Sequence, residues 1–294
     1  MIRMSPRIIR VGTAVTVAAT LSLVSVGGAF AATPKASKDG ASAALVPAKY
    51  KSGIKVATDA SYPPDEYVNS TGQIIGFDKE LLDAIGVTLG VKVTTQNVTF
   101  DNIIPGIKSG KYAVGNSSFT DTPARQVNVN FVDYFKAGEA FYTKTSTTNA
   151  PTTLAGLCSS SVAVESGTIE ESDAQAQKAL CPNNNVTIHS YATQTEADLA
   201  VKSGHDVVGF ADSQVAGYIV AQSKGAFKLS GAPFGVAPYG IATSKSDDGL
   251  KLAKAIQSAL RKLIANGVYR SILAKYGETA GSLTAAEIVL NGGK

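Results

Sequence analysis

Short strand-like and helix-like segments alternate along this chain, and the alternation restricts the possible folds more than any other feature. Residues 54–58 form a β-prone run that ends before two adjacent prolines, Pro63 and Pro64. Residues 77–89 then carry apolar side chains at helical spacing, and strand and helix patterns continue to take turns as far as residue 115. A strand, a helix and a second strand form a parallel unit, so the sequence predicts an α/β fold.

The same alternation starts again after a polar stretch at residues 145–153. It continues to residue 223 and predicts a second α/β unit of about 90 residues. The clearest helical pattern lies at residues 252–276, with an interruption at Asn266 and Gly267, and we interpret its apolar side chains as core packing. A length of 294 residues, at roughly 150 residues per domain, also favours two domains.

The first 31 residues are predicted to be a secretory signal peptide. They contain three Arg and no acid, an uncharged stretch at residues 11–30, and small residues at Ala29 and Ala31 before the expected cleavage site. The alternative is an uncleaved membrane anchor, because about 20 apolar residues can span a bilayer. We expect an exported protein, located in the periplasm or at the cell surface. Residues 32–49, rich in Ala, Ser and Lys, are predicted to be a flexible linker.

The net charge of +4 belongs mostly to the predicted signal peptide. Without the three Arg of residues 1–31, the net charge of the chain falls to +1. The remaining basic residues are scattered and form no patch interleaved with aromatic residues. We therefore expect no nucleic acid partner.

Cys158 and Cys181 are the only cysteines of the chain. In an exported protein this pair favours a disulfide. The alternative is a zinc site that also uses His189 and His205, but these four residues include no closely spaced pair of ligands. The sequence thus favours the disulfide and predicts no metal site.

The residues offer little for catalysis. Two His and two paired Cys exclude a Cys–His dyad and leave little for a Ser–His–Asp triad. No GxSxG, Walker A or GxGxxG pattern occurs. We predict that the protein is not an enzyme and has no cofactor. Ligand recognition remains, at polar turns that follow the carboxyl ends of parallel strands.

Five segments resemble the amino-acid class of the bacterial extracellular solute-binding proteins of family 3, which serve ABC importers. In the family's order they are ATDASYPP (57–64), GFDKELLDAI (76–85), FDNIIPGIKSGKY (100–112), SFTDTPAR (118–125) and VESGT (164–168). The resemblance extends over nearly all of residues 54–277.

This resemblance implies a two-lobe, periplasmic-binding-protein-like type II fold. Each lobe would have a central sheet flanked by helices, and the chain would cross between the lobes twice. Lobe 1 would comprise residues 50–140 and 236–280, lobe 2 would comprise residues 141–235, and residues 281–294 would form a C-terminal tail.

The function implied is the capture of a free amino acid by closure of the two lobes. The closed complex would deliver its ligand to an ABC transporter permease in the membrane, and we expect the binding protein to be a monomer. Two alternatives are a ligand-sensing module and a small-acid dehydratase-like enzyme on the same fold. The sensing module would require signalling segments, and the enzyme would require a positioned acid or base in the cleft.

The resemblance also assigns groups for the α-carboxylate and the α-ammonium of the ligand. Arg125 would form a bidentate pair with the carboxylate, and backbone N–H groups near Thr168, at a helix start, would add donors. Ser118, Thr120 and Asp212 would bind the ammonium. From the residues alone, Arg125 could equally be a surface residue of a turn, and Asp212 could be an ordinary helix N-cap.

A second group of residues is expected around the side chain of the ligand. Tyr62 and Phe100 would sandwich it, although both could instead be core residues. Asp59 and Glu165 lie near the same pocket in the resemblance, and two acids there favour a polar, in particular a basic, amino acid such as arginine, lysine or ornithine. Whether Asp59, Asp65 and Glu165 face the ligand or the solvent is open at this level.

Overall fold

The computed structural model describes residues 34–294 of the chain. The predicted signal peptide and its cleavage site lie outside these residues. Among residues 34–294, no helix combines the length and the apolar character that crossing a membrane requires.

A short helix, α1 (Gly40–Ala44), occupies part of the stretch that we expected to be a flexible linker, so that expectation is wrong for residues 40–49. The Asp39 side chain caps this helix by accepting a hydrogen bond from the Ser42 backbone N–H. Ser42 is fully buried, and Val46 belongs to the core of the first lobe. A few contacts with the rest of lobe 1 are enough to order a segment whose composition alone gives little to bury.

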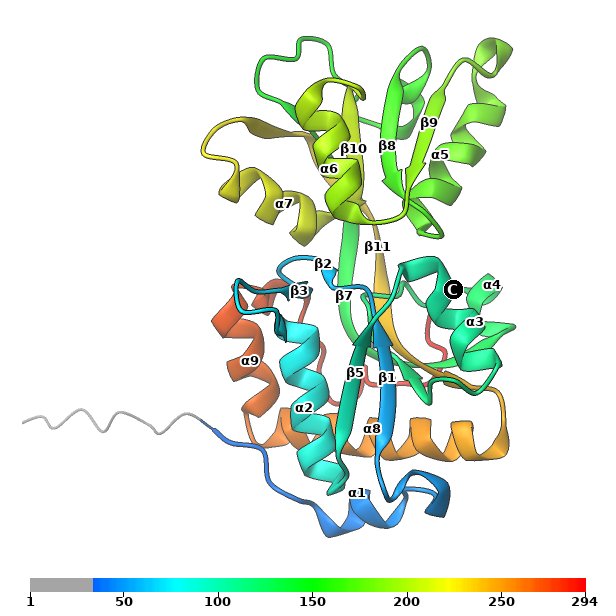
Figure 1. Ribbon diagram of the computed structural model, residues 1–294, viewed down its shortest axis with the longest axis vertical. Coiled ribbons are helices and arrows are strands. Elements are labelled where there is room, and N and C mark those ends of the chain that lie inside the picture. Colours follow the sequence, from blue (N-terminus) through cyan, green and yellow to red (C-terminus); the bar gives the residue numbers. More distant parts are fainter. Residues whose placement is uncertain (1–33) are drawn as a thin grey trace, which may run out of the picture. The chain divides into compact units, whose positions relative to one another are not determined.

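Eight strands of the described residues form one mixed sheet that extends through both lobes (Figure 1). Their spatial order is β5-β1-β6-β11-β7-β10-β8-β9. Their bounds are β1 (Ile54–Thr58), β5 (Val93–Asn97), β6 (Val114–Gly115), β7 (Val129–Lys144), β8 (Ser161–Glu165), β9 (Thr187–Tyr191), β10 (Val208–Asp212) and β11 (Phe227–Ser244). As predicted, β1 pairs in parallel with β5 and β6, and β8 pairs in parallel with β9 and β10.

The long strands β7 and β11 pair with each other along both lobes. They contain 16 and 18 residues and run antiparallel, from the pair Val129–Ser244 to the pair Lys144–Phe227. The register shifts three times, and all three irregularities fall between Ser230 and Gly240 of β11. The lobe boundaries expected at 140/141 and 235/236 therefore lie inside two continuous strands.

The helices of lobe 1 pack around one end of this sheet, which is the lower half in Figure 1. They are α2 (Phe77–Leu89), η2 (Phe100–Asn102), α3 (Ile103–Lys108), α4 (Pro123–Gln126), α8 (Asp247–Ala265) and α9 (Val268–Tyr276). A small antiparallel sheet of β2 (Ser61–Tyr62), β3 (Glu66–Val68) and β4 (Ile74–Ile75) lies next to α2. The C-terminal tail also packs on lobe 1, with η5 (Thr279–Gly281) and the buried side chains of Leu283 and Ile288.

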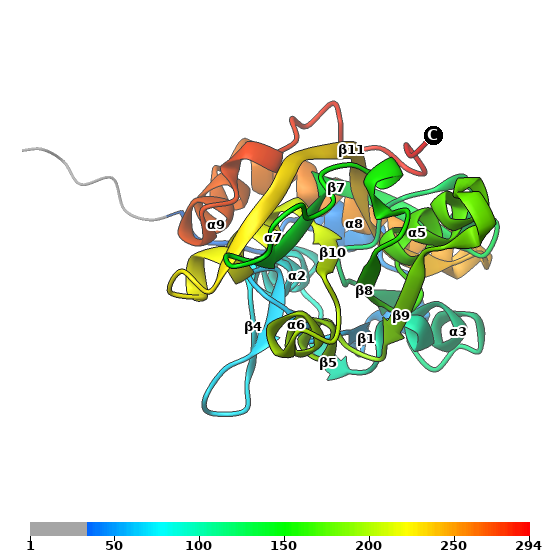
Figure 2. The ribbon, with the colours of Figure 1, turned by 90° about the horizontal axis from the view of Figure 1, so that it is seen from above.

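Lobe 2 contains η3 (Leu154–Leu157), α5 (Ile169–Leu180), η4 (Pro182–Asn184), α6 (Gln194–Ser203) and α7 (Ser213–Gln222). Seen from above, α5 and α6 lie on opposite faces of the sheet formed by β8, β9 and β10 (Figure 2). The predicted disulfide between Cys158 and Cys181 is confirmed, with a Cα–Cα distance of 5.5 Å. It ties the residue after η3 to the end of α5, and the chain-entropy model gives about 3.4 kcal/mol for a loop of this length.

Candidate functional site

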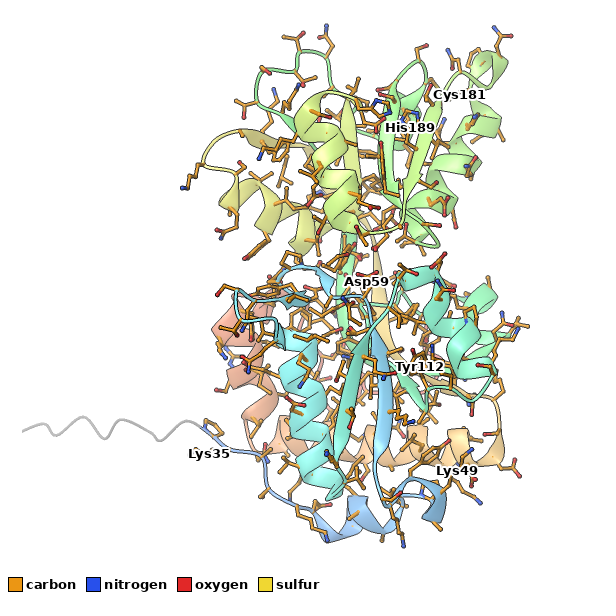
Figure 3. The ribbon with its side chains drawn as sticks, viewed as in Figure 1. Lys35, Lys49, Asp59, Tyr112, Cys181 and His189 are labelled. Carbon is orange, nitrogen blue, oxygen red and sulfur yellow. A yellow bond between two sulfur atoms is a disulfide. The ribbon has the colours of Figure 1, made fainter. Side chains whose placement is uncertain are left out.

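A narrow cleft of about 10 Å³ lies between the lobes. Figure 3 shows Asp59, one of its residues, where the two lobes meet. Most of the lining follows the carboxyl ends of parallel strands, where α/β sheets bind ligands. All the ligand-binding residues predicted from the sequence line this cleft, together with three that were missed. The complete lining is Asp59, Tyr62, Glu66, Phe100, Ser117, Ser118, Thr120, Arg125, Glu165, Thr168, Ile169 and Asp212.

Two carboxylates, one from each lobe, face each other in the cleft. Asp59 follows β1, and its two oxygens accept hydrogen bonds from the backbone N–H groups of Ser61 (3.0 Å) and Phe100 (3.0 Å). Glu165 ends β8, and its Oε1 is buried with no hydrogen-bond partner in the described residues. Burial raises the pKa of both carboxyls, and the charge of Asp59 raises the pKa of Glu165 further. A cation placed between these carboxyls would favour the ionised form of both.

Arg125 lies in the short helix α4, after the buried turn that follows β6. Its Nη1 donates to the carbonyl of Thr120 (2.9 Å), and its Nη2 donates across the cleft to the carbonyl of Gly167 (2.9 Å). The guanidinium also lies over the rings of Phe100 and Phe119, at 5.4 and 5.5 Å from their centroids. These contacts aim the guanidinium into the cleft, so Arg125 is not a solvent-exposed turn residue.

Asp212 ends β10 and stands at the N-cap position of α7, but its side chain makes no capping hydrogen bond. Its Oδ2 instead accepts a hydrogen bond from the hydroxyl of Tyr62 in the opposite lobe (2.9 Å). The backbone N–H of Asp212 donates to the same hydroxyl oxygen (3.0 Å). Burial raises the pKa of Asp212 to about 7, although the nearby charge of Arg125 lowers it. The Asp212 side chain therefore does not act as an ordinary helix N-cap.

Hydroxyl side chains complete the lining. Thr168 caps α5 by accepting from the Glu171 N–H (3.2 Å), which places the N-terminal turn of this helix at the cleft. Ser118 has a backbone φ of 47°, a left-handed conformation that is uncommon for residues other than glycine. Its hydroxyl donates to Asp65 (2.7 Å), so the residue serves the lobe 1 network as well as the cleft.

Three buried acids lie behind the lobe 1 wall: Asp65, Glu66 and Asp78. Burial and mutual repulsion raise the pKa of Asp65 and of Glu66, and burial raises that of Asp78 to about 6. Asp78 lies in the first turn of α2, where it is buried and accepts a hydrogen bond from the Tyr134 hydroxyl (2.6 Å). Of these acids only Glu66 lines the cleft.

The missed residues Glu66, Ser117 and Ile169 are immediate neighbours of residues considered from the sequence. Glu66 accepts a hydrogen bond from the Ser117 hydroxyl (2.7 Å), and this hydroxyl also accepts from the Asp59 N–H (2.9 Å). Of the three, only Ser117 could have been predicted from the sequence, because it is adjacent to Ser118 in the same polar turn.

Direct hydrogen bonds hold the lobes together at the cleft and near the crossing strands. The Gln214 side chain donates to Asp65 (2.8 Å) and to the Tyr239 hydroxyl (2.5 Å), and the Gln194 N–H donates to Ser61 (3.2 Å). The disulfide occupies both cysteines, so neither can ligate a metal. The cleft therefore combines buried acids, one Arg and two aromatic rings, which suits a small zwitterion with a cationic side chain.

The chain matches the model of the family "Bacterial extracellular solute-binding proteins, family 3" over residues 54–279. It is 32% identical over 251 residues to the "Arginine-binding protein ArgT" of Corynebacterium glutamicum, covering 83% of this chain and 81% of that protein. It is 26% identical over 231 residues to the "Histidine-binding periplasmic protein" of Salmonella typhimurium, covering 76% of this chain and 86% of that protein. Both relatives are binding proteins rather than enzymes.

The fold agrees with a solved structure of "An ancestral arginine-binding protein bound to arginine". The TM-score is 0.71 at 31% sequence identity, and the match covers 76% of this chain and 97% of that one.

Proposed function

The chain belongs to the bacterial extracellular solute-binding proteins of family 3, and we propose that it captures a free basic amino acid, arginine first of all, for an ABC importer. Amino-acid capture for import follows from the family and its relatives. The basic side chain of the ligand, the contacts that bind it, the monomeric state and the export of this chain are the proposed parts.

The observation that supports a basic ligand is the pair of buried carboxylates, Asp59 and Glu165. A cation between them would compensate the burial of both and would give Glu165 Oε1 the partner that it lacks. A planar guanidinium has five N–H donors and can bind two carboxylates at once, whereas an ammonium acts as a point charge. Arginine therefore fits this pair better than lysine or ornithine, and an acidic side chain would be repelled.

The other end of the ligand would be bound by Arg125 and Asp212. In this proposal the Arg125 guanidinium exchanges its contact with the Gly167 carbonyl for a bidentate pair with the α-carboxylate. The N–H groups at the start of α5, beyond Thr168, support the same carboxylate. Asp212 pairs with the α-ammonium, assisted by Thr120. Ser118 contributes to the same polar wall.

The aliphatic part of the ligand would lie between Tyr62 and Phe100, which line the cleft from lobe 1. Both rings are at least nine-tenths buried. Closure of the lobes over the ligand removes water from its charged contacts and strengthens them. The closed protein would then dock on a permease and release its ligand there. A sensing module and a dehydratase-like enzyme have less support, because the arginine-binding and histidine-binding relatives are both binding proteins.

A calorimetric panel of amino acids with the mature chain tests this proposal. We expect tight one-to-one binding of arginine, weaker binding of lysine and ornithine, and no binding of glutamate. Glu165→Gln should weaken arginine binding by about 10- to 100-fold, because a charge-assisted hydrogen bond is replaced by a neutral one. The same change should leave an uncharged ligand such as glutamine much less affected. Tight binding of glutamate without binding of arginine would refute the basic ligand.

The proposed carboxylate contact has its own test. Arg125→Ala should abolish binding of every amino acid in the panel, and Arg125→Lys should restore only part of it, because an ammonium cannot pair bidentately. A thermal melt checks that both variants are folded. Normal affinity in a folded Arg125→Ala protein would show that another group binds the carboxylate.

A further inference from the structure

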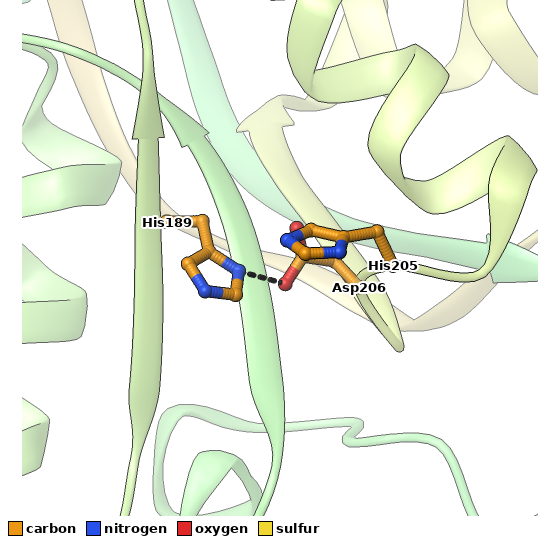
Figure 4. Close-up of side chains that lie close together, drawn as sticks. All are labelled: His189, His205 and Asp206. Atoms are coloured by element: carbon orange, nitrogen blue, oxygen red, sulfur yellow. Dashed lines mark hydrogen bonds and ion pairs between the residues drawn. The ribbon is translucent and has the colours of Figure 1, made fainter.

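The fold brings together three side chains of lobe 2 that are able to ligate a metal ion, one from His189 and two from the adjacent residues His205 and Asp206. His189 lies in β9, at the edge of the sheet, while His205 and Asp206 lie between α6 and β10. One ligand atom from each residue lies within 4.8 Å of the other two (Figure 4). His189 and His205 are the only histidines of the chain, and both are in this cluster.

We propose that His189, His205 and Asp206 form a binding site for a divalent transition-metal ion, and that Zn²⁺ fits it best. Two imidazole nitrogens and one carboxylate oxygen, with water as the fourth ligand, make a donor set that suits tetrahedral Zn²⁺. Mg²⁺ and Ca²⁺ prefer oxygen ligands alone and should bind weakly. The spacing of the two histidines in the sequence does not indicate this site, because the end of β9, the helix α6 and two loops separate them.

The loop that carries two of the ligands is well fixed. The backbone N–H groups of His205 and Asp206 both donate to the carbonyl of Ala200 in α6, at 2.9 and 3.2 Å. Gly204, with a φ of 84°, ends that helix and turns the chain toward the site. The backbone therefore needs no rearrangement to present both side chains.

A supporting contact also orients the carboxylate. Asp206 is 2% exposed, and its Oδ2 accepts a hydrogen bond from the Tyr191 hydroxyl (2.9 Å). Carboxylates that ligate a metal commonly accept a hydrogen bond from a residue that does not itself bind the metal, and this bond fixes their orientation. The other oxygen, Oδ1, lies 2.7 Å from Nδ1 of His189. A metal ion would take the place of the proton in this contact.

The remaining adjustment falls on the two imidazoles. Their rings stack with centroids 4.7 Å apart and 29° between their planes. Ligand atoms around a tetrahedral Zn²⁺ lie about 3.3 Å apart. The His189 and Asp206 donor atoms, now 2.7 Å apart, must therefore separate slightly, and the His205 donor atom, which lies within 4.8 Å of both, must approach them by at most about 1.5 Å. His205 is exposed and His189 is partly exposed, so rotation of their side chains can provide this movement without a change in the core.

The site is separate from the amino-acid cleft. None of its three residues lines the cleft, and Figure 3 shows His189 well within lobe 2 and Asp59 where the lobes meet. Metal binding and amino-acid binding can therefore be measured independently, and failure of one proposal does not affect the other.

The test is a titration of the untagged, chelator-stripped mature chain with ZnCl₂ by calorimetry. We expect one saturable Zn²⁺ site per chain in the micromolar range. A 100-fold excess over the dissociation constant should raise the Tm by about 5 °C. His205→Ala, a change at an exposed side chain, should weaken Zn²⁺ binding at least tenfold. It should leave arginine binding unchanged.

Lys202→Ala, on the neighbouring surface of α6, is the matched control and should bind Zn²⁺ like the original chain. His189→Gln gives a second, independent loss of a ligand. Three results would overturn the proposal: no saturable Zn²⁺ binding, full binding in the His205→Ala variant, or one Zn²⁺ per two chains with a dimer in sedimentation. The last result would show that the histidines bridge two copies instead of forming a site within one.

Discussion

Asp212 is the residue whose protonation should control the affinity for an amino acid. Its carboxyl is 5% exposed, and burial raises its pKa to about 7. Below that pH the Asp212 carboxyl is mostly neutral. It can still accept the hydrogen bond from the Tyr62 hydroxyl, but it lacks the negative charge that would pair with an α-ammonium. Asp59 and Glu165 have pKa values raised in the same direction and by the same main cause.

We therefore predict that arginine affinity rises with pH up to about 7 and then levels off. Each unit below the pKa of Asp212 should weaken binding by about tenfold, because the fraction of ionised Asp212 falls in that proportion. Calorimetry at pH 5.5, 6.5 and 8.0, in buffers with different ionisation enthalpies, measures both the affinity and the protons released. Equal affinities at pH 5.5 and 8.0 would contradict the prediction.

Asp212→Asn is the matched variant for this experiment. It keeps the shape and the contact with Tyr62 but removes the titrating charge. We expect weaker binding at pH 8.0 and a flatter pH profile, with the remaining slope due to Asp59 and Glu165.

Asp59, Arg125 and Asp212, which the sequence predicted to bind the ligand, all line the cleft, and their role in binding stays a prediction. Their positions follow from motifs that place polar turns after strands. What could not be predicted is which side-chain atoms are left without partners. Asp65 accepts hydrogen bonds from Ser118 and Gln214 on one oxygen only, and in the described residues both its other oxygen and Oε1 of Glu165 are buried without a partner. These differences depend on contacts between segments far apart in the sequence.

Among the elements, β7 and β11 are the strands that continue from one lobe into the other, so we expect any movement of the lobes to bend them. Gly138 lies in β7 near the middle of this pair. A Cβ atom added at this position would lie 2.6 Å from the carbonyl oxygen of Phe234 in β11. The two backbones would have to separate there.

Gly138→Ala should therefore impair closure of the lobes and weaken arginine binding by about tenfold or more, with each lobe still folded. X-ray scattering with and without arginine measures closure as a decrease in the radius of gyration. Gly217→Ala in α7, where an added Cβ meets no atom within 4 Å, is the matched control and should bind normally. Unchanged affinity and unchanged compaction in Gly138→Ala would show that this part of the strands does not act as a hinge.

The helices were easier to predict than these strands. The apolar periodicity of residues 252–276 and the break at Gly267, which has a φ of 79°, correspond to α8 and α9. By contrast, nearly every residue of β7 is buried, so neither face shows the alternation that marks a strand with one face in solvent. The length of β7 follows from its position between the two lobes, which no local pattern records.

For the molecule as a whole, the number of buried carboxyls determines how stability depends on pH. Burial raises the pKa of the carboxyls of Asp65, Glu66, Glu165 and Glu170, and it raises that of Glu139 to about 8. In the unfolded chain these groups lose their protons near pH 4. As the pH rises from about 4 to 8, the folded state therefore binds more protons than the unfolded state, and its stability falls.

We predict that the ligand-free protein melts several degrees higher at pH 5 than at pH 8, measured by circular dichroism at constant ionic strength. Exposed acids with lowered pKa do not reverse this trend, because Glu287, with a pKa of about 2, loses its contribution only below pH 4.5. Glu139→Gln should reduce the difference in melting temperature between pH 5 and pH 8. Oε2 of Glu139 is buried without a partner in the described residues, and the substitution removes the charge that Glu139 would carry at pH 8. Saturating arginine should also reduce this difference, because the bound cation stabilises the ionised forms of Asp59 and Glu165. A ligand-free protein that is more stable at pH 8 than at pH 5 would show that these carboxyls are ionised and compensated in the folded state.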